Sequence, residues 1–338
     1  MSLNLLLYDI FVKNIFELCF KQKPAEMSFC FHKMKSSVLY ENRYCSQDEF
    51  SIVVCGGKDK NWDATKEVSE IRGPDFEKSS ELTPMLKPRD EFINTAVVGS
   101  DLHVIGGEWS DEWTFEIYSA KTKGWKECEP PHMLLKWCSI CSFMKSVYVI
   151  GGLECATYGN SCYKYDKSLN KWNKMAELNT ERHSSACIVF EGKIVVVGGR
   201  NRINLKSVES YDHHENKWTF LSEMMETKYS PSAASMGNKM FVIGKIDRYC
   251  RPEVYDNTSR KFAFLIEKIP IRSYCKHYTR TLTIGNKLVV FYNTNYQYTQ
   301  KTLVYDVIRN KWVENGDVLC KDYSMLPYSC TLQKVPKT

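Results

Sequence analysis

The sequence of 338 residues predicts an all-β protein, a six-bladed propeller in which each blade is a four-stranded antiparallel sheet. Three observations predict this architecture. An apolar run that ends in two glycines recurs along the chain, and a tyrosine that precedes a tryptophan by seven residues recurs in phase with it. A C-terminal segment can supply the one strand that the first blade lacks. Because one four-stranded sheet cannot bury both of its faces, sheets repeated at this period indicate propeller blades.

The apolar runs predict the buried strands. Their first glycine lies at 56, 106, 151, 198 and 244, so the steps are 45 to 50 residues. The runs are rich in β-branched residues and too short for helices. Two glycines end a run where the chain leaves the sheet, at backbone angles or close contacts that a side chain would forbid. We expect structural roles for Gly56, Gly57, Gly106, Gly107, Gly151, Gly152, Gly198 and Gly199. The fifth run has Gly244-Lys245 and the sixth has Phe291-Tyr292.

The tyrosine–tryptophan pairs predict the two outer strands of each blade. They are Tyr118–Trp125, Tyr165–Trp172, Tyr211–Trp218, Tyr255–Phe262 and Tyr305–Trp312. Aspartate follows four of these five tyrosines and can cap the turn between the outer strands. We expect Trp125, Trp172, Trp218 and Trp312 to be structural anchors, because each offers a large ring to the next sheet. The first repeat departs from the pattern, with Ile71 and Lys78 at the tyrosine and tryptophan positions.

The first blade needs an inner strand from elsewhere in the chain. No apolar strand and glycine turn precede its Gly-Gly run, whereas Tyr328–Lys334 follows the last tryptophan and has no later repeat to serve. We expect this segment to close the ring, which removes the open sheet edges.

The recurring set of Gly-Gly, Tyr-Asp and a tryptophan six residues after the aspartate resembles the kelch repeat family. The resemblance covers roughly residues 50 to 336, and we place the propeller at 46–336. It implies a protein-interaction module of the kind found in BTB-kelch substrate adaptors of cullin ubiquitin ligases. About 45 preceding residues are too few for a BTB domain of roughly 100, so we expect ligase recruitment only through a BTB domain that this sequence does not contain. An actin-associated structural kelch protein is the alternative.

Residues 1–45 form a separate region in this interpretation. Leu3, Leu7, Phe11, Ile15 and Leu18 fall on one stripe of an amphipathic helix, and residues 21–45 have no clear period and are expected to be a linker. The helix either docks on the propeller or is a remnant of a helical domain like the BACK domain.

Composition narrows the class of function. The net charge of +6 is spread along the chain, so nucleic acid is not an expected partner. No apolar run is long enough to span a membrane, and Asp9, Lys13 and Glu17 interrupt the N-terminal apolar stretch, so we expect neither a membrane span nor a signal peptide. We expect most of the 14 cysteines to be small buried side chains in a reducing compartment, and the protein to be cytoplasmic.

We expect no catalytic chemistry, no cofactor and no bound metal. A catalytic kelch protein would resemble galactose oxidase, with copper held by His and Tyr, but the seven histidines are scattered. His183 lies near a loop that enters an inner strand, while His213 and His214 fall in an outer turn. No phosphate-loop, nucleophile or acid-pair motif occurs either.

The candidate partner site is the central face of the propeller. Six connections lead from the outer strand of one blade to the inner strand of the next. The compared position lies ten or eleven residues after each anchor residue, or directly after Pro88 in the first connection. It is basic in five of the six, with Asp322 in the remaining one: Arg89, Lys136, Arg182, Lys228 and Arg272. The loops after the glycine pairs add residue types that concentrate at binding hot spots: Trp109, Tyr158, Arg200, Arg202, Arg248 and Tyr249. We expect these residues to bind a protein or peptide, and an acidic peptide in particular. The alternative is that the arginines clamp neighbouring blades and the aromatic rings cover blade edges.

Overall fold

The computed structural model divides the chain into two compact units, Met1–Asn42 and Arg43–Thr338. The structure describes residues 50–57, 63–72, 78–89, 93–107, 114–131, 135–154, 157–244, 251–267, 269, 279–293, 300–317 and 329–334, all in the second unit. The helix and linker expected in residues 1–45 lie outside these residues. No helix that could cross a membrane is found in the part that is described.

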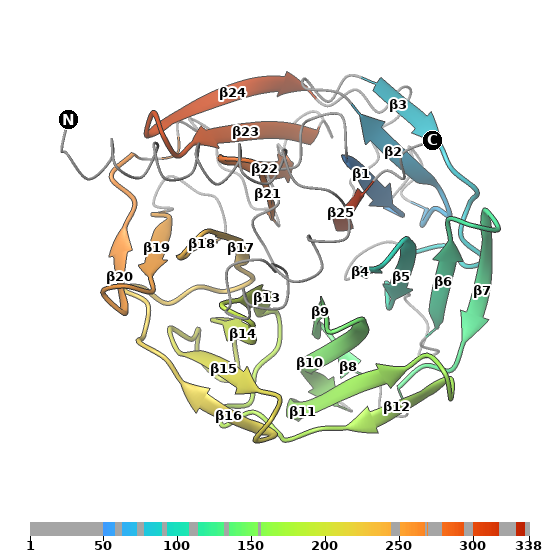
Figure 1. Cartoon of the computed structure of the whole chain (residues 1–338), viewed down its shortest axis with the longest axis horizontal. Coiled ribbons are helices and arrows are strands. Elements are labelled where there is room, and N and C mark those ends of the chain that lie inside the picture. The colour runs from blue at the N-terminus through green and yellow to red at the C-terminus, as the bar shows by residue number, and fades with distance from the viewer. Residues whose placement is uncertain are drawn as a thin grey trace, which may run out of the picture. The chain divides into compact units, whose positions relative to one another are not determined.

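Six antiparallel sheets follow one another around a central axis, each running from an inner to an outer strand (Figure 1). The first blade contains β25 (Ser329–Lys334), β1 (Phe50–Cys55), β2 (Val68–Arg72) and β3 (Lys78–Glu81). The second contains β4 (Asn94–Val98), β5 (Asp101–Ile105), β6 (Phe115–Ser119) and β7 (Gly124–Cys128). The third contains β9 (Ser139–Phe143), β10 (Ser146–Glu154), β11 (Thr157–Asp166) and β12 (Lys171–Lys174), and the short strand β8 (Leu135–Lys136) pairs with β10.

The last three blades repeat the same order. The fourth contains β13 (Ala186–Phe190), β14 (Lys193–Val197), β15 (Val208–Asp212) and β16 (Lys217–Phe220). The fifth contains β17 (Ser232–Met236), β18 (Lys239–Ile243), β19 (Glu253–Asp256) and β20 (Lys261–Phe264). The sixth contains β21 (Arg280–Ile284), β22 (Lys287–Asn293), β23 (Gln300–Asp306) and β24 (Lys311–Asp317).

The C-terminal strand closes the ring. β25 pairs with β1 along its whole length, with Val53 opposite Thr331, so the first and last segments of the propeller share one sheet. The predicted all-β, six-bladed propeller closed by a C-terminal strand is therefore confirmed.

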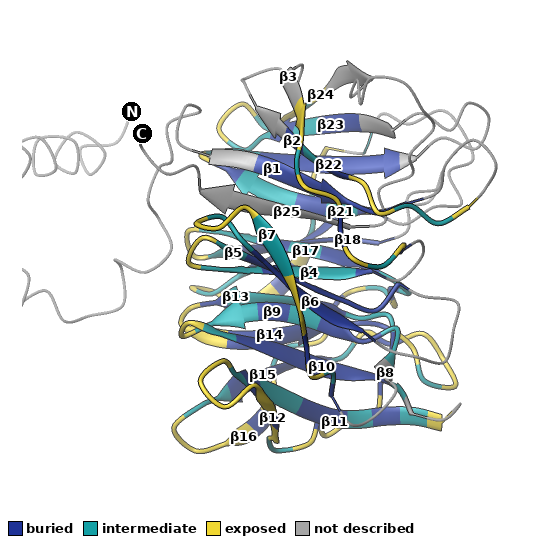
Figure 2. Ribbon diagram, turned by 90° about the vertical axis from the view of Figure 1, so that its right-hand side faces the viewer, coloured by how far each residue is buried: buried dark blue, intermediate teal, exposed yellow. Residues whose placement is uncertain are grey.

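The hydrophobic core lies between neighbouring blades. Tyr148 and Ile150 of the third blade form one buried cluster with Ile194, Val196 and Trp218 of the fourth. In Figure 2 the buried residues follow the second strand of the blades, as in β10 and β14, while exposed residues gather in the turns. Each blade thus buries its apolar faces against the next blade, which is why one sheet would not be stable alone.

The anchor tryptophans also tie blades together through their indole N–H groups. Trp172 Nε1 donates to the carbonyl of Glu129 at 2.8 Å, and Trp218 Nε1 donates to that of Ala176 at 3.0 Å. Trp125 and Trp312 make the equivalent bonds to Thr83 and Glu267. Every acceptor belongs to a segment that follows the outer strand of the preceding blade, so each tryptophan spans a blade junction.

The aspartate that follows four of the five repeated tyrosines caps the outer turn, as predicted. In the fourth blade the backbone N–H groups of His214 and Glu215 donate to Asp212 at 2.9 and 3.3 Å. Asp166, Asp256 and Asp306 accept the same pair of bonds in their own turns.

The first blade departs from the register read off the sequence. Ile71 lies opposite Ser79, whereas Tyr118 lies opposite Trp125 in the second blade. Ser79 and not Lys78 therefore occupies the tryptophan position, because the segment between the two outer strands is one residue longer than in the other blades.

Candidate functional site

Three of the predicted basic residues lie in buried ion pairs across blade junctions. Arg89 pairs with Glu116 at 2.7 Å, Arg182 with Glu209 at 2.6 Å and Lys228 with Glu253 at 3.0 Å, and all six side chains are at most 4% exposed. We call these three pairs the blade clamps. The glutamates stand two residues before Tyr118, Tyr211 and Tyr255, on the third strand of the following blade.

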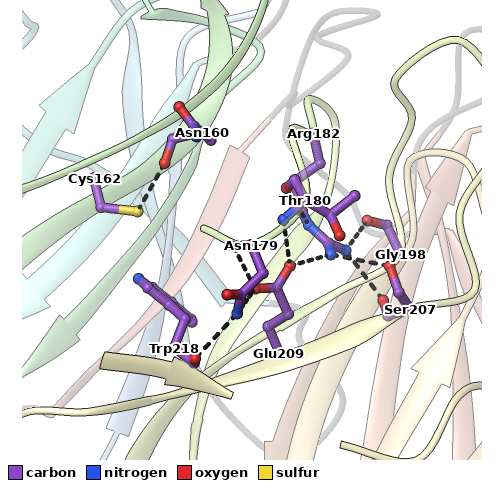
Figure 3. Close-up of polar contacts among 9 residues, drawn as sticks. All are labelled: Asn160, Cys162, Asn179, Thr180, Arg182, Gly198, Ser207, Glu209 and Trp218. Atoms are coloured by element: carbon purple, nitrogen blue, oxygen red, sulfur yellow. Dashed lines mark hydrogen bonds and ion pairs between the residues drawn. The ribbon is translucent and has the colours of Figure 1, made fainter. Parts of the chain in front are cut away.

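The two charges of the clamp at Arg182 have a full set of hydrogen-bond partners (Figure 3). Besides Glu209, the guanidinium donates to the carbonyls of Gly198 and Ser207 at 2.8 and 3.1 Å and to the Ser207 hydroxyl at 3.0 Å. Glu209 in turn accepts the backbone N–H groups of Asn179 and Thr180 at 2.8 and 3.1 Å. Such a network is stable in a dry interior because both ions have their full set of partners.

The glycine pair holds the backbone of the same arginine. The N–H of Gly152 donates to the Arg182 carbonyl at 2.9 Å. At Gly151, where φ is +59°, a Cβ atom would lie 2.4 Å from that carbonyl oxygen, so only glycine allows the approach. Arg182 is therefore tied to the third blade by its backbone and to the fourth by its side chain.

Burial sets the electrostatics of the clamp. Desolvation lowers the pKa of the Arg182 guanidinium, and the negative charge of Glu209 opposes this shift. A partner could reach this charge only by breaking the ion pair, which would leave Glu209 buried without its counter-ion. The burial of Arg89, Arg182 and Lys228 thus favours the alternative role of blade clamps, and partner binding by these side chains stays a prediction.

The register corrects the alignment of Lys136. Ser139 begins its inner strand where Ala186 and Ser232 begin theirs, so Leu135 takes the position of Arg182, and Lys136 takes that of His183. Position 163, two residues before Tyr165, is tyrosine and offers no carboxylate for a clamp. Lys136 instead lies half-buried on β8, where it pairs with Leu153 of β10.

A cluster of rings lies beside the clamps. It consists of Trp137, Tyr158, His183 and Tyr229, together with Arg200, and we call it the aromatic rim. Trp137, His183 and Tyr229 enter from three successive blade connections, while Tyr158 and Arg200 follow the glycine pairs of the third and fourth blades. Only Tyr158 and Arg200 are among the residues predicted from the sequence.

His183 is the centre of the rim. Its ring centroid lies 5.0 Å from that of Trp137, 5.7 Å from that of Tyr158 and 6.3 Å from that of Tyr229. The Tyr158 ring is stacked on it, with 7° between the planes. The Arg200 guanidinium lies over the Tyr229 ring at 5.9 Å, a cation–π geometry.

Local backbone pairing explains why these residues meet. β10 and β11 extend beyond the glycine pair of the third blade, which carries Tyr158 beyond the end of the ordinary blade. His183 and Arg200 form an isolated bridge through two reciprocal backbone bonds of 2.9 Å. In the loop after Arg200, the side chain of Asn201 accepts the N–H of Ile203 at 3.1 Å.

The rim has a buried neutral centre and an exposed cationic margin. Burial, together with the positive charge of Arg200, lowers the pKa of His183 and so favours its neutral form at pH 7. Arg200 and Arg202 are exposed, and within the part of the chain that is described neither forms an ion pair. Exposed arginines beside aromatic rings are the composition expected of a protein-binding surface.

Some of the predicted site residues are not available for comparison. Arg272, Arg248, Trp109 and Tyr249 lie outside the described residues. Conversely, Trp137 and Tyr229 were not predicted from the sequence, and His183 was counted among packing or solvated histidines. A signal was present: a ring residue directly follows a basic one in Lys136-Trp137, Arg182-His183 and Lys228-Tyr229.

Within the described ranges, no three His, Cys, Asp or Glu side chains are grouped so that they could hold a metal ion.

Comparison with known proteins agrees with the architecture. The model of the Kelch motif matches residues 181–225, which run from the connection before the fourth blade to the one after it. Kelch repeat protein C2 of cowpox virus is 30% identical over 111 residues, 32% of this chain and 22% of the relative. Kelch-like protein 36 of Bos taurus is 26% identical over 167 residues, 46% of this chain and 26% of the relative. The matches thus span about a quarter or less of the relatives' length. Together with the six-bladed ring, they support a kelch-repeat β-propeller.

Proposed function

We propose that this propeller recognises a protein partner through the aromatic rim and the adjacent arginines, without catalysing a reaction. The observation that carries the proposal is the meeting of three half-buried aromatic rings, a buried histidine and an exposed arginine from five separate segments. Tryptophan, tyrosine and arginine dominate the binding energy of protein interfaces. The closed ring holds these segments rigidly, which reduces the entropy lost on binding.

The partner segment that fits this surface is acidic. Arg200 and Arg202 are exposed, and guanidinium groups hold carboxylates through paired, charge-assisted hydrogen bonds. Because these charges are solvated, we expect a dissociation constant on the order of micromolar that rises with salt.

Kinship supports an interaction role. The relatives are named as kelch-repeat and kelch-like proteins, and kelch propellers mainly serve as interaction modules. We extend this to a cytoplasmic protein whose propeller recognises substrates, as in adaptors of cullin ligases, with the ligase contact made by another domain.

The test is capture from cell extract with the full chain as bait. The rim variant is Arg200→Glu with Arg202→Glu. Its matched control is Lys217→Glu with Lys261→Glu, which changes the charge by the same amount at exposed positions of β16 and β20. Captured proteins are quantified by mass spectrometry at two salt concentrations.

The proposal predicts partners that the wild type and the control retain, and that the rim variant loses by about tenfold or more. A captured set that is the same for all three baits contradicts it. A cullin in the retained set supports the adaptor role. If the protein cosediments with actin filaments, and the rim variant does so as well as the wild type, the structural alternative is supported instead.

A further inference from the structure

We infer that Trp137 is the principal partner contact of the aromatic rim and that it binds a ring side chain, proline or aromatic, next to a carboxylate in the partner. The inference rests on the proposed function and deepens it. This tryptophan does not belong to the anchor series at Trp125, Trp172 and Trp218.

The backbone at Trp137 is the first argument. Its φ is +58°, in the left-handed region that bulky residues rarely adopt. The register makes Ser184 and Ser230 its equivalents in the next two connections, and both have φ of +48°. The fold thus requires the left-handed turn at this position but accepts a small side chain there. A tryptophan at a strained position where serine suffices in the next two connections points to a role outside folding.

The surroundings of the indole are the second argument. Trp137 is half-buried, and its ring leans on His183, with 5.0 Å between centroids and 37° between planes. Its carbonyl accepts the N–H of Ser184 at 2.8 Å, which ties its backbone to the next connection. His183 is held in turn by the stacked Tyr158. The indole therefore has a rigid support and keeps part of its surface accessible, as a binding anchor requires.

Charge and ring chemistry together define the occupant. A ring side chain buries a large flat area against indole at little cost in conformational entropy. Arg200 is bridged through its backbone to His183, the ring that supports Trp137, and its guanidinium lies over the Tyr229 ring. A positive charge therefore lies in the same cluster as the indole. A short extended segment can place a ring on Trp137 and a neighbouring carboxylate near Arg200.

The test uses a phage-displayed library of random twelve-residue peptides, selected on the immobilised full chain. Enriched peptides are synthesised, and their affinities are measured for the wild type, Trp137→Ala, Trp137→Gly, Ser230→Gly and the Arg200→Glu/Arg202→Glu variant. Each peptide is also made with its ring residue replaced by alanine. Thermal unfolding of every variant is followed in parallel.

The inference predicts enriched peptides that place proline, phenylalanine, tyrosine or tryptophan beside aspartate or glutamate. Both Trp137 variants should weaken binding by about tenfold or more, and should respond little to loss of the peptide ring. Ser230→Gly should bind as the wild type does. Because glycine relieves the left-handed strain, Trp137→Gly should unfold about 1–3 °C above Trp137→Ala, against the usual order of these residues.

Two results overturn the inference and leave the proposed function standing. One is normal binding by both Trp137 variants while Arg200→Glu/Arg202→Glu loses it. The other is a library that enriches no peptide although capture from extract still depends on Arg200 and Arg202. Binding that no rim variant affects overturns the inference and the proposed function together.

Discussion

The blade clamps and the aromatic rim are built from neighbouring residues but differ in the exposure and pairing of their charges. Arg182 is fully buried and forms an ion pair with Glu209 of the next blade. Arg200, which pairs through its backbone with His183, is exposed. The clamp joins two blades, and the exposed arginine of the rim is where we propose that a partner binds. A basic residue near the propeller axis is therefore no sign of binding until its counter-ion has been sought.

The largest effect should come from the clamp. Glu209→Ala leaves Arg182 buried without its counter-ion and removes the acceptor of the Asn179 and Thr180 N–H groups. We expect a loss of about 3–5 kcal/mol in the free energy of unfolding, measured by denaturant titration. Glu215→Ala, at an exposed turn position, should change it by less than about 0.5 kcal/mol. Equal losses for the two variants would remove the distinction between buried and exposed charge.

The second largest effect should be the loss of folding stability at acid pH, which we assign to a buried histidine of the interior more than to the rim. Burial lowers the pKa of His103 to about 4, so the folded protein binds fewer protons than the unfolded chain between pH 6.5 and 4. Stability is therefore lost as pH falls through this window, by about 2–3 kcal/mol between pH 7 and 4.5. In His103→Gln most of that loss should vanish, whereas in His214→Gln, an exposed control, it should remain. Denaturant titrations at pH 7 and 4.5 measure the loss of unfolding free energy. An equal loss in His103→Gln and in the wild type would refute its assignment to His103.

Gly151→Ala should have a smaller effect and measures how tightly the clamp backbone is held. The added Cβ meets a left-handed φ and the Arg182 carbonyl, while at Gly192, with φ of +70°, no atom lies within 4 Å of the same position. We expect a loss of about 2 kcal/mol for Gly151→Ala and about 1 kcal/mol for Gly192→Ala. Thermal unfolding of both variants isolates the cost of the close approach, and an equal loss would mean that the carbonyl can move away.

The fold could be predicted because its signals are periodic. Glycine pairs, tyrosines and tryptophans repeat in phase, and each has a local reason that holds in every blade. Ring closure followed from counting strands. The register of the first blade was misread, because the segment between its outer strands is one residue longer than the repeat implies.

The site was harder to predict because its meaning depends on pairs of distant residues. Arg182 and Lys136 are both basic residues at a similar distance after an anchor tryptophan. Arg182 finds a counter-ion because Glu209 stands two residues before Tyr211, whereas Tyr163 stands in that place in the third blade. Glu116, Glu209 and Glu253 were visible as a second repeated signal on the partner strand. Trp137 follows a basic residue, as His183 and Tyr229 do, but its register equivalents are serines. What sets it apart is a bulky side chain at the left-handed backbone angle that those serines share.

The most direct test of this account is a paired measurement on Arg182→Ala and Arg200→Ala, with the free energy of unfolding and the affinity for one selected acidic peptide determined for each. The account predicts that Arg182→Ala loses about 3–5 kcal/mol of stability and, below its unfolding midpoint, binds within about twofold of the wild type. Arg200→Ala should keep its stability within about 0.5 kcal/mol and weaken the peptide by about tenfold. The opposite pattern, with Arg182 needed for binding and Arg200 for stability, would contradict the separation of clamp and rim.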